Sequence, residues 1–212
     1  MLFNGGCCVR QPQLLFTMNE NTNALRIGQH HIYAVPDLFK GKNLRTDIIS
    51  EEHFLYRWWF PSDSPIVKYL EKYLKAHPDD VDLHYVHYRL KKKEIGNTTY
   101  YAFYFGKSID GRKRFGQHTR GPVKQSTLRE TLRAILSIQG LPCSEDDISK
   151  ELRGCYYEWM EFLPEDYELI DSFEMMAIAI GYYPLNLDGN SSISEPWKAA
   201  IMDKRKELKD YK

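Results

Sequence analysis

The stretch YFGKSIDGRKRFGQH, residues 104–118, joins the end of an aromatic strand to a short basic helix. The strand is predicted over Thr98–Phe105, where tyrosine and phenylalanine dominate, and the helix over Asp110–Thr119. Arg114 and His118 stand four residues apart, a spacing that places both side chains on one face of a helix. This strand-to-helix unit therefore carries a tyrosine, an arginine and a histidine in close succession.

Gly106-Lys107-Ser108 also looks like the end of a phosphate-binding loop of a nucleotide triphosphatase. That motif requires a glycine five residues before Gly106, and Tyr101 stands there instead, with no glycine-rich run around it. The sequence therefore argues against a nucleotide triphosphatase.

The spacing around Gly106 matches another pattern. Arg114 follows it by eight residues and His118 comes four residues later. With Tyr104-Phe105-Gly106, this resembles the GIY-YIG nuclease family, in which a strand ending in Tyr-Ile-Gly leads into a helix with an arginine and, one turn later, a tyrosine or histidine. The first half-motif, Gly-Ile-Tyr, falls on Phe54-Leu55-Tyr56, with Phe54 in place of the glycine.

The resemblance continues towards the C-terminus and covers residues 53–190. Glu174 matches the metal-binding glutamate of the family, and Asn186, twelve residues later in Pro184-Leu185-Asn186, matches its asparagine. Restriction-type members carry insertions between the half-motifs and a histidine after the arginine, so the pattern is closest to that branch. The resemblance implies an α+β fold with a small antiparallel central sheet flanked by helices.

Local patterns predict the other elements. In chain order they are a strand at His31–Val35, a strand at His53–Phe60, a helix from Ser64-Pro65 to Pro78, a hairpin of Val81–Lys92 with Thr98–Phe105 around Gly96-Asn97, helices at Ser126–Ile138 and Ser144–Leu152, a strand at Tyr156–Leu163, a helix at Pro164–Ile180 and a closing helix at Trp197–Leu208. The sheet is expected to form around Tyr56, Tyr88 and Tyr104, with the first and last on adjacent strands.

Two helices have more detailed expectations. Thr127 and Glu130 stand at capping-box spacing at the start of the helix over Ser126–Ile138. The helix over Pro164–Ile180 is expected to turn four apolar side chains inward, namely Leu169, Phe173, Ala177 and Ile180, and to end at Gly181.

Phosphodiester hydrolysis needs an in-line nucleophile, neutralisation of charge on the phosphorane and help for the leaving oxygen. The resemblance assigns the catalytic roles to Tyr56, Tyr104, Arg114, His118 and Glu174. Glu174 would hold one Mg²⁺ or Mn²⁺ ion through oxygen, and Arg114 offers a planar fork for phosphate. Tyr56 is the predicted acceptor of the water proton, because basic neighbours such as Lys107 would favour its phenolate; His118 is the rival base.

The charge distribution points to a polyanionic partner, although the chain has 29 basic and 29 acidic residues. Residues 89–133 hold twelve Lys and Arg and three acids, whereas residues 145–174 hold eleven acids and two basic residues. Two solvated helix faces would give the same counts. With the resemblance, the expected partner is double-stranded DNA. The predicted contacts to phosphate or DNA are Lys107, Arg112, Lys113, Arg120, Lys124 and Asn186, with Arg112 and Lys113 facing solvent beside Arg114.

Composition excludes several other classes. Hydrophobic residues make up 42% of the chain and charged residues 27%, as in globular proteins. No apolar run reaches the roughly 18 residues that cross a bilayer, and no secretory signal is visible at the start. Four cysteines, Cys7, Cys8, Cys143 and Cys155, are too few for a disulfide scaffold. We therefore expect a cytoplasmic protein with reduced thiols and no membrane association.

The expected organisation is a leader or accessory extension over residues 1–50, a nuclease domain over 51–192 with an insert at about 61–98, and a basic helix over 193–212. The extension, the insert and the closing helix are candidate surfaces for DNA or for a homodimer. The leading hypothesis is a divalent-metal-dependent DNA endonuclease. A nucleic-acid-binding module that does not cleave, favoured by Phe54, and a protein-interaction module remain the alternatives.

Overall fold

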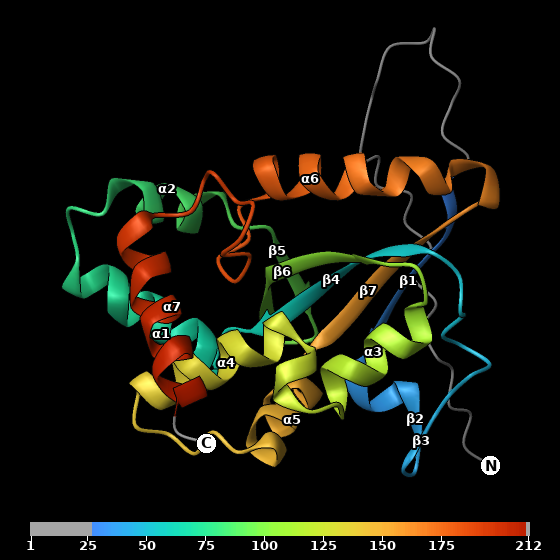
Figure 1. The fold of residues 1–212 in the computed structure, drawn as a ribbon, viewed down its shortest axis with the longest axis horizontal. Coiled ribbons are helices and arrows are strands. Elements are labelled where there is room, and N and C mark those ends of the chain that lie inside the picture. Colours follow the sequence, from blue (N-terminus) through green and yellow to red (C-terminus); the bar gives the residue numbers. More distant parts are fainter. Residues whose placement is uncertain (1–26, 211–212) are drawn as a thin grey trace, which may run out of the picture.

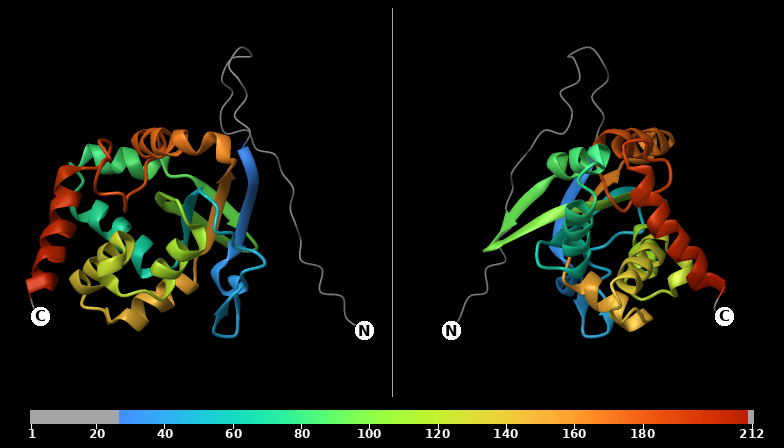
Figure 2. Two further views of the ribbon diagram at one scale, coloured as in Figure 1. Left: turned by 45° about the vertical axis from the view of Figure 1, so that its right-hand side comes forward. Right: turned by 90° about the vertical axis from the view of Figure 1, so that its left-hand side faces the viewer.

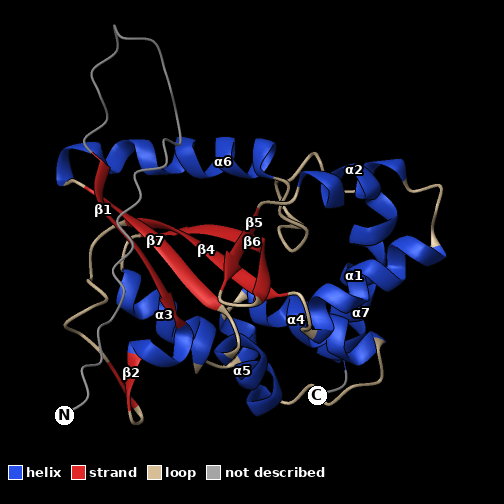
Figure 3. Ribbon diagram, turned by 180° about the vertical axis from the view of Figure 1, so that it is seen from behind, coloured by secondary structure: helices blue, strands red, loops and turns tan. Residues whose placement is uncertain are grey.

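A five-stranded antiparallel sheet lies at the centre of the computed structural model, which describes residues 27–210 (Figure 1). The strands lie side by side in the order β1 (Ile27–Ala34), β7 (Tyr156–Phe162), β4 (Phe54–Pro61), β6 (Thr98–Ser108) and β5 (Lys92–Ile95) (Figure 3). Seven α-helices surround the sheet within the described range: α1 (Pro65–Ala76), α2 (Val81–Arg89), α3 (Gly111–Thr119), α4 (Thr127–Ile138), α5 (Glu145–Arg153), α6 (Ile170–Gly181) and α7 (Glu195–Asp210). The predicted α+β fold is confirmed.

Shorter elements complete the architecture. Three 3₁₀ helices cover Val35–Leu38, Val123–Gln125 and Pro164–Leu169, and β2 (Phe39–Lys40) pairs with β3 (Asn43–Leu44) in a small second sheet. Among the helices within residues 27–210, none combines the length and apolar character needed to cross a membrane.

Both faces of the sheet are covered, which explains why β4 reads as a nearly continuous aromatic run. Phe54, Tyr56 and Trp58 turn towards a large core shared with α1, α3, α4, α5 and α7. Leu55 and Trp59 turn towards a smaller core closed by α6. Figure 2 shows α6 on one side of the sheet and α3, α4 and α5 on the other. A strand buried on both faces needs no alternation of polar and apolar residues.

A buried ion pair lies on the α6 side of the sheet. Arg57 Nη1 is 3.2 Å from Glu158 Oε2, while Trp59 Nε1 donates to the same oxygen at 2.7 Å and His30 Nε2 lies 2.7 Å from Oε1. Burial opposes ionisation of this carboxyl, but Arg57, His30 and Lys93 together lower the pKa of Glu158 to about 2. Glu158 therefore stays charged in the folded protein.

The segment Val81–Lys92 corrects one prediction, because most of it is helical. Asp80 caps α2 by accepting the backbone N–H of Leu83 at 3.0 Å, and Leu83 and Val86 are buried at helical spacing. Only Lys92–Ile95 forms the predicted partner of β6, across a turn where Gly96 has φ +60°. Tyr88 consequently lies on α2 with 79% of its surface exposed, not in the sheet.

The start of α4 corrects another detail. Ser126, not Thr127, is the capping residue, and its hydroxyl accepts the backbone N–H of Arg129 at 3.2 Å. Ser126 has the extended backbone of a cap, whereas Thr127 is already helical. A complete capping box occurs instead at α5, between Ser144 and Asp147.

The helix expected over Pro164–Ile180 is two helices, a 3₁₀ helix and then α6. Phe173 and Ala177 pack against the smaller core as predicted, but Leu169 and Ile180 are 42% and 58% exposed. Ile170 and Ile178 pack against the smaller core instead, so the inward face of α6 leaves out Leu169 and Ile180. Gly181 is the last helical residue, and Tyr182 takes the left-handed conformation after it with φ +53°.

The three predicted segments remain an expectation about domain boundaries. The strand expected at His31–Val35 is found as β1, which forms an edge of the central sheet. The rest of the predicted leader up to residue 26, including Cys7 and Cys8, lies outside the described residues. The predicted insert contains α1, α2 and β5, and α7 packs on α1 through Trp197, whose ring lies 5.4 Å from that of Tyr69.

Candidate active site

Two tyrosines from adjacent strands form the floor of the site on the sheet. Tyr56 on β4 is paired with Gly106 on β6, and its ring lies 6.3 Å from the ring of Tyr104. Tyr104 is paired with Trp58, two residues from Tyr56, so strand alternation places Tyr104 on the same side of the sheet as Tyr56; the register of the two strands shifts only beyond this pair. The prediction that Tyr56 and Tyr104 lie on adjacent strands is confirmed.

Gly106 is required by the close approach of Tyr56. A Cβ atom at residue 106 would lie 2.6 Å from the Tyr56 hydroxyl and 2.7 Å from its Cζ atom, well inside van der Waals contact. Any side chain at this position would therefore displace the phenol. This gives the glycine of the second half-motif a physical role.

The Tyr56 hydroxyl connects the sheet to α3. It accepts a hydrogen bond from Arg114 Nε at 3.0 Å and lies 2.8 Å from His118 Nε2. The other ring nitrogen, Nδ1 of His118, lies 2.7 Å from the hydroxyl of Ser126. Because Arg114 and His118 lie one turn apart on the same face of α3, as the spacing predicted, both reach the same phenol.

The pKa values in this cluster are set mainly by burial. Burial, followed by the charges of Arg114 and Arg129, holds the pKa of His118 well below its ordinary value. Burial, with a further contribution from Tyr104, raises the pKa of Tyr56 well above its ordinary value. The expected stabilisation of the Tyr56 phenolate by basic neighbours is therefore not found, because desolvation outweighs Arg114 and the Lys107 ammonium binds carboxylates elsewhere.

Arg114 is held in place by neutral partners. Besides Tyr56, it donates from Nη1 to the side chain of Gln117 at 3.2 Å, and the Tyr104 hydroxyl is another hydrogen-bond partner. No carboxylate pairs with Arg114 among residues 27–210. The guanidinium thus keeps its full charge and has N–H donors left for an anionic ligand.

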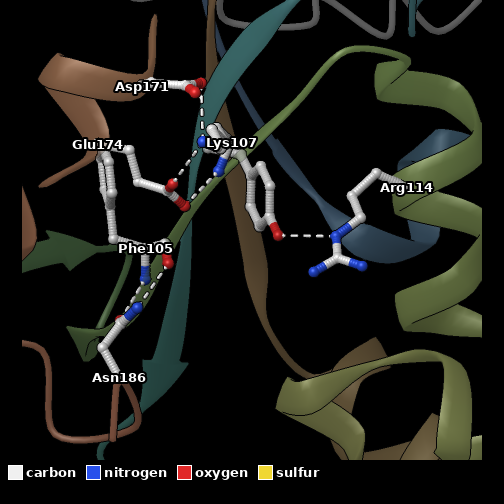
Figure 4. Close-up of polar contacts among 7 residues, drawn as sticks. Phe105, Lys107, Arg114, Asp171, Glu174 and Asn186 are labelled. Carbon is white, nitrogen blue, oxygen red and sulfur yellow. Dashed lines mark hydrogen bonds and ion pairs between the residues drawn. The ribbon is translucent and has the colours of Figure 1, made fainter. Parts of the chain in front are cut away.

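Glu174 lies on the other side of β6, near the end of that strand (Figure 4). Its Oε1 accepts the backbone N–H of Lys107 at 3.0 Å, and its Oε2 is 3.4 Å from the Lys107 ammonium. The same ammonium donates to Asp171 at 2.7 Å. Figure 4 shows Arg114 and Glu174 approaching this end of β6 from opposite sides.

The charge of Glu174 nevertheless acts on the two tyrosines across β6. After burial, the charge of Glu174 is among the causes that raise the pKa values of Tyr56 and Tyr104. The structure therefore brings Tyr56, Tyr104, Arg114 and His118 into contact. The Glu174 carboxylate is close enough to influence the pKa values of both tyrosines but is not hydrogen-bonded to them.

A single divalent cation fits the donors present. Within residues 27–210, no group of three or more His, Cys, Asp or Glu side chains is placed to enclose a metal ion. Glu174 offers hard carboxylate oxygens that already attract one cation, the Lys107 ammonium. Such a donor set suits Mg²⁺ or Mn²⁺, which bind through one or two carboxylates and complete their shell with water and substrate phosphate.

Asn186 is buried and binds the backbone of β6. Its side-chain oxygen accepts the N–H of Phe105 at 2.8 Å, and its amide nitrogen donates to the C=O of Phe105 at 2.8 Å (Figure 4). This geometry favours a role in holding the segment after α6 against β6 over the predicted contact with phosphate.

The remaining predicted contact residues lie around α3 and the turn that follows it. Lys113, Arg120 and Lys124 are exposed. Arg112 does not face solvent as expected, because its guanidinium donates to the carbonyl groups of Thr46 and Ile49 and pairs with Glu51. It holds the segment before β4 against α3.

Sequence reasoning missed two residues of the site and the structural role of a third, Phe54. Ser126 and Asp171 carry no signal in one sequence, because each acts through a partner that only folding brings close. Phe54 was noted as a departure from the motif, and its ring fills the space over Gly111, where a Cβ would lie 1.4 Å from Phe54 Cε1. The large residue in β4 is thus matched by a glycine at the start of α3.

Comparison with known proteins identifies the family to which this arrangement of residues belongs. A family model described as the GIY-YIG catalytic domain matches residues 54–207. No curated protein and no solved structure matches the chain.

Proposed function

Because the chain belongs to the GIY-YIG catalytic-domain family, we propose that it is an endonuclease that hydrolyses phosphodiester bonds of double-stranded DNA and requires a divalent metal ion. The family indicates a nuclease in general. The observation that carries the finer proposal is the contact of Arg114 and His118 with the Tyr56 hydroxyl at the end of β6.

Glu174 is the residue that would hold Mg²⁺ or Mn²⁺, displacing the Lys107 ammonium from its carboxylate. Such an ion, when bound, neutralises charge on the reacting phosphate and helps the leaving oxygen. Lys107 would then be free to contact the DNA backbone, as its position at the end of β6 favours.

Arg114 would bind the phosphate that is cleaved. Its Nε is fixed by Tyr56 and its Nη1 by Gln117, so the guanidinium plane is already oriented before DNA arrives. Pre-oriented donors stabilise developing charge without reorganisation during the reaction. The exposed residues Lys113, Arg120 and Lys124 would contact flanking phosphates.

Tyr56 and His118 would move the proton of the attacking water. In the neutral state of His118, Nε2 can accept the Tyr56 proton while Nδ1–H donates to Ser126. Tyr56 can then take the water proton as its own moves to His118. An anionic phosphate beside Arg114 offsets one of the charges that depress the pKa of His118, which makes this transfer easier in the complex than in the free protein.

A module that binds DNA without cleaving it is the second candidate, since Phe54 replaces the glycine of the first half-motif. The structure weakens its basis, because the Phe54 ring is accommodated over Gly111 and does not displace Tyr56. A cytoplasmic setting and a homodimer remain parts of the proposal that rest on the sequence.

Cleavage of supercoiled plasmid tests the proposal. The native chain should nick or linearise plasmid with Mg²⁺ or Mn²⁺ and not with EDTA. Glu174→Gln should abolish cleavage and retain DNA binding, whereas Glu168→Gln, which changes an exposed carboxylate nearby, should cleave normally. Undiminished cleavage by Glu174→Gln would reject the metal-binding role, and DNA binding without cleavage by the native chain would favour the second candidate.

A further inference from the structure

A pocket outside the candidate active site lies where α2 meets the end of α6. It has a volume of about 400 Å³ and is lined by Tyr88, Arg89, Lys91, Ile180 and Tyr182. Figure 1 shows α2 and the C-terminal end of α6 approaching each other at this point. The volume falls within the range of small-ligand sites in proteins.

The aromatic residues of this pocket are unusually accessible. Tyr88 is 79% exposed and Tyr85, on the same helix, is 52% exposed. The ring of Tyr85 packs edge-on against that of Tyr182 at 5.5 Å. The rings of Tyr85 and Tyr88 are thus open to solvent at or beside the pocket, where a flat apolar ligand could stack.

Tyr182 adopts a backbone conformation that is costly for a tyrosine. With φ +53° it occupies the left-handed position at the end of α6, where glycine is the usual residue because it has no Cβ. The strain accompanies an aromatic ring that lies 5.5 Å from the Arg89 guanidinium. Retained strain of this kind is a marker of functional sites.

The cations of the pocket lack anionic partners. Neither Arg89 nor Lys91 forms an ion pair with a carboxylate within the described part of the chain. Burial, reinforced by the charge of Arg57, lowers the pKa of Lys91 to about 8. A phosphate group would supply the missing negative charge.

We propose that this pocket binds an unpaired nucleotide of the DNA substrate, with the base stacked on Tyr88 and Tyr182 and the adjoining phosphate paired with Arg89 and Lys91. The inference rests on the proposed function, whose substrate it narrows to DNA with a single-stranded segment near the cleaved bond. Stacking on aromatic rings beside basic side chains is how proteins bind single strands without reading sequence.

The position of the pocket fits one continuous strand. Glu174 and Tyr182 are eight residues apart along and just beyond α6, which is about 12 Å at the helical rise. That distance corresponds to roughly three to four nucleotides at the duplex rise. A strand at the active site can therefore place an unpaired nucleotide in the pocket.

The experiment compares two DNA ligands in EDTA, where cleavage does not interfere. One is a duplex with a short single-stranded tail that contains the fluorescent base 2-aminopurine, and the other is the blunt duplex. Tyr88→Ala should weaken binding of the tailed DNA by about 5- to 160-fold, the value of one stacked base, and leave the blunt duplex within about twofold. It should also abolish quenching of 2-aminopurine.

Two further variants control for structure. Tyr88→Phe keeps the ring and should bind like the native chain. Tyr182→Gly removes the other ring at a position where glycine relieves backbone strain, so it should lose tail binding without unfolding. Equal affinity of the native chain for both ligands, or equal losses on both with Tyr88→Ala, would overturn the proposal.

Cleavage assays separate this inference from the proposed function. A tail preference that depends on Tyr88 supports the pocket even if the native chain cuts no DNA. Metal-dependent cleavage without any tail preference rejects the pocket alone.

Discussion

The guanidinium of Arg114 is the residue-scale feature with the clearest consequence for catalysis. Arg114→Lys keeps the charge but loses the fork that contacts Tyr56 and that, in the proposed function, would bind the phosphate at the same time. We expect a loss of about 2–4 kcal/mol in transition-state stabilisation, comparable to removal of one oxyanion donor, measured as kcat/KM for plasmid cleavage. Lys113→Ala, which removes an exposed charge from the position before Arg114, should lower kcat/KM much less. Equal losses in the two variants would contradict the selection of Arg114.

Gly106 gives a second test at this scale, with a matched glycine nearby. Gly106→Ala places a methyl group 2.6 Å from the Tyr56 hydroxyl, so the phenol must leave Arg114 and His118, and we expect cleavage to fall at least about 100-fold, as when a catalytic group is displaced. Gly116→Ala on α3 meets nothing within 4 Å and should instead raise stability by about 0.5–1 kcal/mol. Retention of normal cleavage by Gly106→Ala would show that the Tyr56 contacts are dispensable.

At the scale of elements, Asn186 fastens the segment after α6 to β6. Asn186→Ala leaves the buried N–H and C=O of Phe105 without partners, which should cost about 2–5 kcal/mol of unfolding free energy. Asn186→Asp keeps the acceptor for the N–H but cannot donate to the C=O, so it should also be destabilising. Urea denaturation measures both. An unchanged midpoint for Asn186→Ala would mean that the segment is held by its apolar contacts alone.

The elements also show what local sequence could and could not predict. The strands β4, β6 and β7 and the helices α1, α3, α4 and α5 follow from aromatic runs, caps and apolar spacing. The tyrosines and valines of residues 81–89 favour extended structure and so predict a strand. The segment is nevertheless a helix, capped by Asp80 and packed through Leu83 and Val86 on one face. Short segments with both patterns are decided by tertiary packing.

At the scale of the whole molecule, the order of strands was not predictable from local patterns. The strand β7, late in the chain, lies between β1 and β4, and this places Glu158 beside Arg57. Spacing along the chain could predict that Arg114 and His118 share a helix face, and the family resemblance linked them to Tyr56 and Tyr104. Neither the spacing nor the resemblance could predict Ser126 as the partner of His118, because that contact depends on where folding places the start of α4 relative to α3.

Stability against acid should reveal the buried histidine and the buried carboxylate together. Below pH 6.5 the unfolded chain protonates His118 while the folded chain, in which its pKa is well lowered, does not. The unfolded state then binds more protons, and stability falls as the pH falls. Glu158 acts in the same direction lower down, between its ordinary pKa of 4.5 and about 2 in the folded state, because its carboxylate is stabilised only in the folded protein.

The two contributions separate by pH and by mutation. Between pH 6.5 and 5, the native chain should lose unfolding free energy faster than His118→Gln, with a difference in slope that grows towards about 1.4 kcal/mol per pH unit, the value for one proton. The other described histidines contribute equally to both chains and cancel in the comparison. Below pH 4.5 Glu158 should lower the unfolding free energy of both chains by the same amount, because both chains retain it. Urea unfolding at a series of pH values measures the slopes. Equal slopes for the two chains between pH 6.5 and 5 would mean that His118 is protonated in the folded state as readily as in the unfolded chain, so that burial does not keep it neutral beside Tyr56.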